Sequence, residues 1–167
     1  GNLEYFPAAL EHHNIEYTIK GAVDFLDLAP KNKPFFLWAA FTTTHGPHEP
    51  IDSGDARNTP EGYSEDHLGL MPDRSEYIDK SKQWRNIVKE TVLWMDGGIG
   101  VILDKLEEKG ELDTTLIVFL SDQQNAGKAS PYERGANIPF IARWPEAIEA
   151  GTKCETLIDV TDMAATF

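Results

Sequence analysis

Apolar residues recur at helical spacing in two stretches of the chain. Between residues 15 and 28, Ile19, Val23 and Leu26 fall on one face and Pro30 ends the pattern, which predicts an amphipathic helix. A second stripe advances by steps of four and three residues and predicts one long helix, with apolar positions at Val88, Val92, Met95, Ile99, Ile102 and Leu106. Each helix therefore has one face to bury against a neighbouring element.

Glycines mark the long helix. Gly110 follows its last apolar position and suits the residue just beyond a helix end. Gly97, Gly98 and Gly100 lie inside the helix, where each costs up to roughly 1 kcal/mol relative to alanine. Close packing of the helix against a sheet and a kink in the helix would each account for them, and the sequence leaves both open.

Three apolar runs predict strands. Residues 34–41 lie between turn residues and are apolar throughout, which is typical of a strand covered on both faces. Residues 115–120 are rich in β-branched side chains, and residues 138–144 end at Pro145. The order helix, strand, long helix, strand, strand indicates the α/β class, here a sandwich with a mainly parallel central sheet flanked by helices.

A segment of different character precedes the long helix. Residues 42–81 are rich in Gly, Pro, Asp, Glu and Ser and show little periodicity, which predicts a long loop. At 167 residues one domain is the default, so we expect residues 1–167 to belong to a single domain with this loop as an insertion. The chain begins at Gly1 and stops at Phe167 inside an amphipathic pattern, so we expect an internal fragment of that domain.

Composition excludes several classes of partner. The 15 Lys and Arg against 28 Asp and Glu give a net charge of −13, which disfavours nucleic acid and anionic membranes. No stretch approaches the roughly 20 apolar residues of a membrane span. The single cysteine, Cys154, excludes an internal disulfide and a multi-cysteine metal site, and we expect it to have no catalytic role.

Candidate chemical groups follow two of the predicted strands, where ligands of open α/β sheets bind. His45 could donate a hydrogen bond to an anion or a leaving group, and a surface histidine in a turn is the alternative. Asp122 and Gln123 offer hard oxygen donors suited to Ca²⁺ or Mg²⁺; the alternative is that Asp122 caps the turn or the next helix. Lys128 could neutralise a tetrahedral anion, or stay solvated.

These groups belong to an ordered series of motifs. The chain resembles the type I sulfatases of the alkaline phosphatase superfamily in Lys-Pro-Phe-Phe-Leu-Trp leading to His-Gly-Pro, in the Trp-Met-Asp of the long helix, and in the strand that ends at Ser-Asp. The resemblance continues through Gly-Lys-Ala-Ser-Pro-Tyr-Glu and Ile-Pro-Phe-Ile-Ala-Arg-Trp-Pro to the Asp-Val-Thr-Asp-Met near the end. It covers nearly everything from about residue 15 onward and implies an alkaline-phosphatase-like catalytic domain.

The resemblance also implies roles for four residues. Asp122 matches the metal-ligating aspartate, and Gln123 stands where an asparagine commonly follows as the next ligand of Ca²⁺ or Mg²⁺. Lys128 matches the lysine that contacts the sulfate group, and His45 matches the histidine that binds sulfate and helps the leaving oxygen depart. The implied substrate is a small-molecule or carbohydrate sulfate ester, and the implied compartment is periplasmic or extracellular.

The chain departs from the pattern at several points. Gln123 is longer than asparagine, Gln124 replaces a frequent glycine, and Arg134 and Asn137 differ from the usual Gly-Gly-x-Arg. The formylglycine nucleophile, made from the Cys or Ser of a Cys/Ser-x-Pro-x-Arg motif, has no counterpart, so we expect it upstream of Gly1 and expect no turnover from the isolated chain. A phosphonate monoester or phosphodiester hydrolase on the same scaffold, and a degenerate non-catalytic member, are the alternatives.

Overall fold

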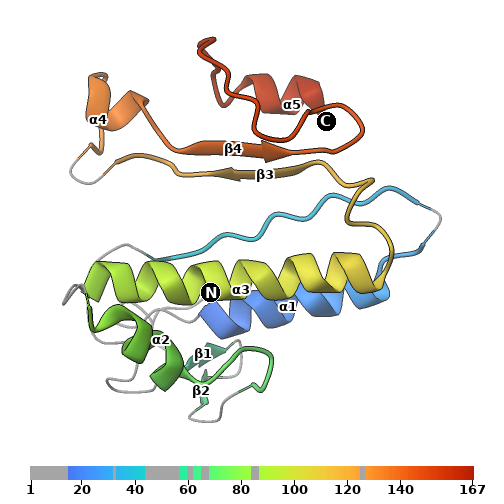
Figure 1. Ribbon diagram of the computed structural model, residues 1–167, viewed down its shortest axis with the longest axis vertical. Coiled ribbons are helices and arrows are strands. Elements are labelled where there is room, and N and C mark those ends of the chain that lie inside the picture. The colour runs from blue at the N-terminus through green and yellow to red at the C-terminus, as the bar shows by residue number, and fades with distance from the viewer. Residues whose placement is uncertain are drawn as a thin grey trace. The chain divides into compact units, whose positions relative to one another are not determined.

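The computed structural model describes residues 15–31, 33–43, 57–59, 62–64, 68–83, 87–124 and 127–167, which fall into two compact units, Gly1–Gly110 and Glu111–Phe167. The elements are α1 (Ile15–Leu28), β1 (Arg57–Thr59), β2 (Gly62–Ser64), α2 (Arg74–Ser81), α3 (Ile87–Glu108), β3 (Ile117–Leu120), α4 (Glu133–Ala136), β4 (Phe140–Arg143) and α5 (Asp162–Thr166) (Figure 1). Both units combine helices and strands, which agrees with the predicted α/β class.

The core of the first unit lies between α1, α2 and α3. In Figure 1, α1 and α3 run side by side, and α2 packs against α3. Ile15 and Ile19 of α1 meet Tyr77 of α2 and Trp94 of α3, and Trp94 is only 2% exposed. Each such apolar side chain contributes about 1.5–3 kcal/mol when fully buried. Both predicted helices are confirmed, and the apolar face of α1 is buried. In α3, Val88 and Val92 of the predicted stripe are exposed, and the helix buries Thr91, Trp94 and Leu106.

Two of the α3 glycines lie where helices approach closely. A Cβ on Gly97 would stand 2.3 Å from the Tyr77 hydroxyl oxygen, and one on Gly98 would stand 2.9 Å from Cγ1 of Ile19. Gly100 has nothing within 4 Å. Close packing therefore explains Gly97 and Gly98, but the neighbours are α2 and α1 rather than a sheet. Gly110 has φ +71° just beyond α3, as expected for a residue after a helix end.

The contrast between Gly97 and Gly100 gives a stability prediction. We expect Gly97→Ala to lower the free energy of unfolding by about 1–3 kcal/mol, because the buried Tyr77 ring must move. Gly100→Ala is the matched control on the same helix, and we expect it to raise stability by up to about 1 kcal/mol. Urea unfolding measures both variants, and equal effects would contradict the packing explanation.

Residues 34–41 are extended but form no strand ladder within the described part of the chain, so the predicted strand is wrong. Burial alternates along the segment. Phe35 packs edge-on against Phe25 of α1 with ring centroids 6.0 Å apart, and Phe41 packs against the helical core. The intervening Phe36 and Trp38 are 60% and 71% exposed. One face is therefore covered by helices, and the expected cover on the other face is not seen among the described residues.

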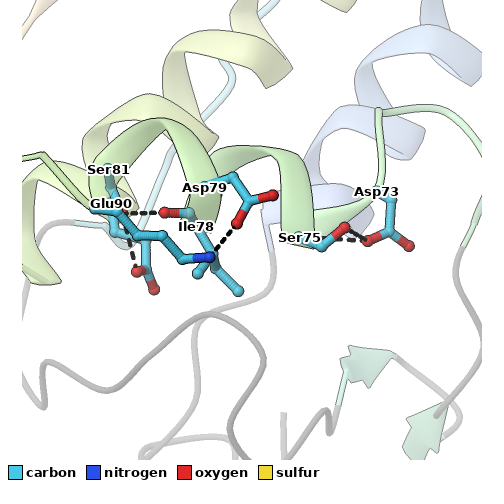
Figure 2. Close-up of polar contacts among 7 residues, drawn as sticks. Asp73, Ser75, Ile78, Asp79, Ser81 and Glu90 are labelled. Carbon is cyan, nitrogen blue, oxygen red and sulfur yellow. Dashed lines mark hydrogen bonds and ion pairs between the residues drawn. The ribbon is translucent and has the colours of Figure 1, made fainter.

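Residues 42–81 are not loop throughout, contrary to the prediction. They contain β1 and β2, which pair antiparallel, and the helix α2. The Asp73 carboxylate caps α2 by accepting hydrogen bonds from the Ser75 N–H at 2.8 Å and from the Ser75 hydroxyl at 2.6 Å (Figure 2). A cap of this kind contributes about 1 kcal/mol to helix stability.

The other end of α2 is tied to α3. The buried Ser81 hydroxyl donates to the Ile78 carbonyl oxygen at 2.8 Å and lies 3.3 Å from the Glu90 carboxylate of α3 (Figure 2). Tyr77 of α2 also lies close to Gly97 of α3, so α2 contacts α3 at more than one point.

The second unit is built on β3 and β4. They pair antiparallel, with Ile117 opposite Arg143 and Leu120 opposite Phe140 (Figure 1). Both strand pairs among the described residues are antiparallel, whereas a mainly parallel sheet was expected. The physical reason lies in the connection, because residues 121–139 return to the end of β3 and their described part contains the short helix α4 rather than a crossover helix.

Candidate active site

Residues 121–139 connect β3 to β4 and carry three of the predicted site residues. We call this segment the Lys128 loop. Its base is closed at the strand ends, where the Ser121 N–H donates to the Pro139 carbonyl oxygen at 3.4 Å. The loop leaves the carboxyl end of β3 and returns to the start of β4.

Asp122 and Gln123 begin the Lys128 loop. The local turn is made by Ser121, whose hydroxyl donates to the Gln123 carbonyl oxygen at 2.8 Å and accepts from the Gln123 N–H at 3.3 Å. Asp122 is exposed, and its carboxylate caps no turn or helix within the described part of the chain. The alternative role of Asp122 as a capping residue therefore lacks support, because the side chain of Ser121 makes the hydrogen bonds of this turn.

Oxygen donors of this kind suit Ca²⁺ or Mg²⁺, but two residues supply too few for either ion. The described residues contain no group of three or more His, Cys, Asp or Glu side chains that could hold a metal. The chemistry of Asp122 and Gln123 fits a hard cation as part of a ligand set, provided that other ligands come from outside the described residues.

Lys128 lies at the tip of a tight turn. The Ser130 N–H donates to the Gly127 carbonyl oxygen at 3.0 Å across Lys128 and Ala129. Ala129 has φ +60°, a left-handed conformation that residues other than glycine rarely adopt. Lys128 itself is exposed, and no ion pair of the described residues involves it. Its charge is therefore available to an anionic ligand.

Two glycines let the Lys128 loop close on itself. A Cβ on Gly127 would lie 1.8 Å from the Arg134 carbonyl oxygen, and one on Gly135 would lie 1.8 Å from the Ser130 carbonyl oxygen. Only glycine allows backbone segments to approach so closely. The sequence prediction missed this role, although glycines on either side of a lysine in a strand-end loop are a readable signal for it.

The structure thus places Asp122, Gln123 and Lys128 on one loop at the end of β3. His45 lies outside the described residues, so its approach to the other three stays a prediction.

Cys154 does not belong to this loop. It is a free, exposed cysteine, and hydrogen bonds from the Thr156 hydroxyl and then from the Thr156 N–H lower the pKa of its thiol.

No helix of the described residues is long and apolar enough to span a membrane.

Comparison with known proteins identifies the family. The family model described as Sulfatase matches residues 3–167, and the chain therefore belongs to the sulfatase family. It is 38% identical over 95 residues to an N-acetylglucosamine-6-O-sulfatase of Bacteroides thetaiotaomicron, a match that covers 53% of this chain and 17% of the relative.

Two further relatives match over longer stretches. A Ulvan-active sulfatase of Formosa agariphila is 28% identical over 169 residues, covering 81% of this chain and 28% of the relative. The human N-acetylgalactosamine-6-sulfatase is 26% identical over 182 residues, covering 98% of this chain and 30% of the relative. The chain thus spans less than a third of the length of these relatives.

Proposed function

We propose that this chain is part of a sulfatase that hydrolyses sulfate esters through an alkaline-phosphatase-like catalytic domain. The observation that carries the proposal is the Lys128 loop, which presents an exposed ammonium and two oxygen-donor side chains beyond the end of β3 in a member of the sulfatase family. In the transition state the entering and leaving oxygens are both partly bonded to sulfur, and the negative charge on the sulfate oxygens is best stabilised by charges that are fixed before the reaction begins.

Each residue has a distinct role in the proposed reaction. Lys128 binds a sulfate oxygen and stabilises the charge that develops on it. His45 donates a hydrogen bond to the leaving oxygen as its bond to sulfur breaks. Asp122 and Gln123 contribute to holding a divalent cation, which when bound supplies Lewis-acid polarisation of a sulfate oxygen.

The nucleophile is proposed to come from another part of a longer protein. The chain contains no Cys/Ser-x-Pro-x-Arg motif, from which the formylglycine of the family would be made. We therefore propose that these 167 residues supply part of the metal and sulfate-binding site and do not turn over substrate alone. A periplasmic or extracellular location is proposed with the family, as is a carbohydrate sulfate ester as substrate, since relatives named for sulfated sugars are among the matches.

Hydrolysis rates of paired esters test the proposal. We expect the full-length protein to hydrolyse 4-nitrophenyl sulfate with a kcat/KM at least about tenfold above that for 4-nitrophenyl phosphate or a phenyl phosphonate ester, a difference of about 1.4 kcal/mol in transition-state stabilisation. Release of nitrophenol measures all three. The 167-residue chain alone is the control and should give no turnover.

Other outcomes would assign the alternatives. A higher rate on the phosphate or phosphonate ester would replace the sulfatase by a phosphorus-ester hydrolase of the same superfamily. No hydrolysis of any ester, together with calcium binding that appears in calorimetry only after Gln123→Asn, would identify a degenerate member whose metal site has been lost.

A further inference from the structure

Gln124 makes hydrogen bonds at three places in the Lys128 loop, and none of the roles above uses them. Its N–H donates to the Arg134 carbonyl oxygen at 2.9 Å, and its carbonyl oxygen accepts from the Gly127 N–H at 2.9 Å. Its side-chain amide donates to the Asn137 carbonyl oxygen. One residue thus connects the start of the loop, the turn that carries Lys128 and the return toward β4.

The turn that carries Lys128 needs such support. Ala129 stands in a left-handed conformation directly after Lys128, and backbone conformations of this kind persist only where surrounding contacts hold them. The Ser130 N–H closes this turn on the Gly127 carbonyl oxygen, and the N–H of Gly127, the residue at which the turn begins, donates to the Gln124 carbonyl oxygen. The main chain of Gln124 therefore contacts the residue at which the turn carrying Lys128 begins, so the position of Gln124 bears on the position of that turn.

The Gln124 side chain is also exposed, so core packing does not explain it. Its amide joins two points of the loop that are separated by 13 positions in the sequence. Asn137, which receives that bond, is in turn held at the end of α4 by its own N–H, which donates to the Glu133 carbonyl oxygen at 2.9 Å, and by its side chain, which donates to the Glu133 carboxylate. The amide of Gln124 therefore attaches the start of the loop to a fixed point.

We infer that Gln124 is a positioning residue for Lys128: by tying Gly127 and Asn137 together it holds the Lys128 ammonium where a sulfate oxygen binds. The inference rests on the proposed function in that it takes Lys128 as the sulfate-binding cation. Gln124 touches neither substrate nor metal in this scheme and acts only through the geometry of the loop.

Truncation of the side chain tests the inference in the full-length protein. Gln124→Ala should lower kcat/KM for 4-nitrophenyl sulfate by roughly 10- to 100-fold, because a binding group displaced by about 1 Å loses that much. Gln83→Ala is the matched control. Gln83 is also an exposed glutamine whose side-chain amide donates to a backbone carbonyl, that of Lys80 at 3.3 Å, and its removal should leave kcat/KM unchanged.

A double mutant separates positioning from a general structural effect. If Gln124 acts through Lys128, then adding Gln124→Ala to Lys128→Ala should lower kcat/KM no further. An equal loss on both backgrounds would overturn the inference, and so would wild-type activity of Gln124→Ala beside an impaired Lys128→Ala.

Amide hydrogen exchange gives a readout that does not depend on activity. Exchange at Gly127 and Ser130 should be faster in Gln124→Ala than in the wild type and unchanged in Gln83→Ala. Unchanged exchange in Gln124→Ala would overturn the inference. If the wild-type protein hydrolyses no sulfate ester, the proposed function fails, and the exchange rates still decide whether Gln124 holds the loop.

Discussion

Replacing Lys128 with alanine in the full-length protein should lower kcat/KM for a sulfate ester by roughly 100- to 1,000-fold, the loss typical for removing one preorganised group that stabilises developing charge. The expectation follows from the exposure of Lys128 and from the tight turn that fixes its backbone. Lys128→Arg keeps the charge but replaces a compact ammonium with a planar fork, so it should restore only part of the rate. Steady-state kinetics on 4-nitrophenyl sulfate measures both variants.

The control for this prediction is another exposed lysine of the same unit. Lys153 lies outside the Lys128 loop, and Lys153→Ala makes the same change in net charge. We expect it to change kcat/KM less than about twofold, because Lys153 is exposed, has no role in the proposed site, and its charge is screened by salt. A similar loss in both variants would mean that overall charge matters and not the position of Lys128. Full activity of Lys128→Ala would show that Lys128 is an ordinary solvated lysine.

The sequence predicts the two long helices because their apolar residues repeat at the period of a helix. That face is buried in α1, whereas Val88 and Val92 of the α3 stripe are exposed. The shorter α2 was missed, since it is mostly polar. Its start was nevertheless encoded, because Asp73 followed three positions later by Glu76 is the pattern of an N-terminal capping box, and Asp73 is the observed cap. The residue types at the start of α2 therefore indicate a helix that the apolar pattern of residues 42–81 does not reveal.

The strands show where the sequence is insufficient. Residues 34–41 are apolar on both faces, so the observed alternation of burial is not present in the sequence and depends on which elements pack against each face. The direction of pairing between β3 and β4 likewise depends on the path of residues 121–139, because the same apolar strand can join a parallel or an antiparallel pair. Both properties are set by contacts between distant parts of the chain.

The candidate site likewise has features that the sequence predicts and features that it does not. The residue types of Asp122, Gln123 and Lys128 and their place after a strand could be predicted, because the chemistry of an anion site limits the side chains that serve it. The bonds of Gln124 and the close approach of Gly127 to Arg134 could not, since they join positions that only the folded loop brings together. The geometry that fixes Lys128 is thus a tertiary property, and a single methyl group placed in it should have a large effect.

Gly135→Ala is that change. The added Cβ would lie 1.8 Å from the Ser130 carbonyl oxygen and 2.9 Å from the Gly127 carbonyl oxygen, and backbone atoms cannot move aside as a flexible side chain can. We expect the variant to destabilise the second unit by about 3 kcal/mol, the upper end of the usual cost of overpacking, and to lower kcat/KM for a sulfate ester as much as Lys128→Ala does. Urea unfolding and steady-state kinetics measure the two effects.

Gly151→Ala separates steric conflict from backbone conformation. Gly151 has φ +80° but nothing within 4 Å of a Cβ, so its replacement should cost only about 1 kcal/mol and leave the kinetics unchanged. If Gly135→Ala is no more destabilising than Gly151→Ala, then the backbone at Gly135 and Ser130 is not in the close contact described, and the rigid support of Lys128 is absent. Suppose instead that Gly135→Ala is destabilised but keeps full activity. The close contact in the loop would then be as described, but Lys128 would have no part in binding sulfate, because activity would survive the loss of the geometry that holds the ammonium in place.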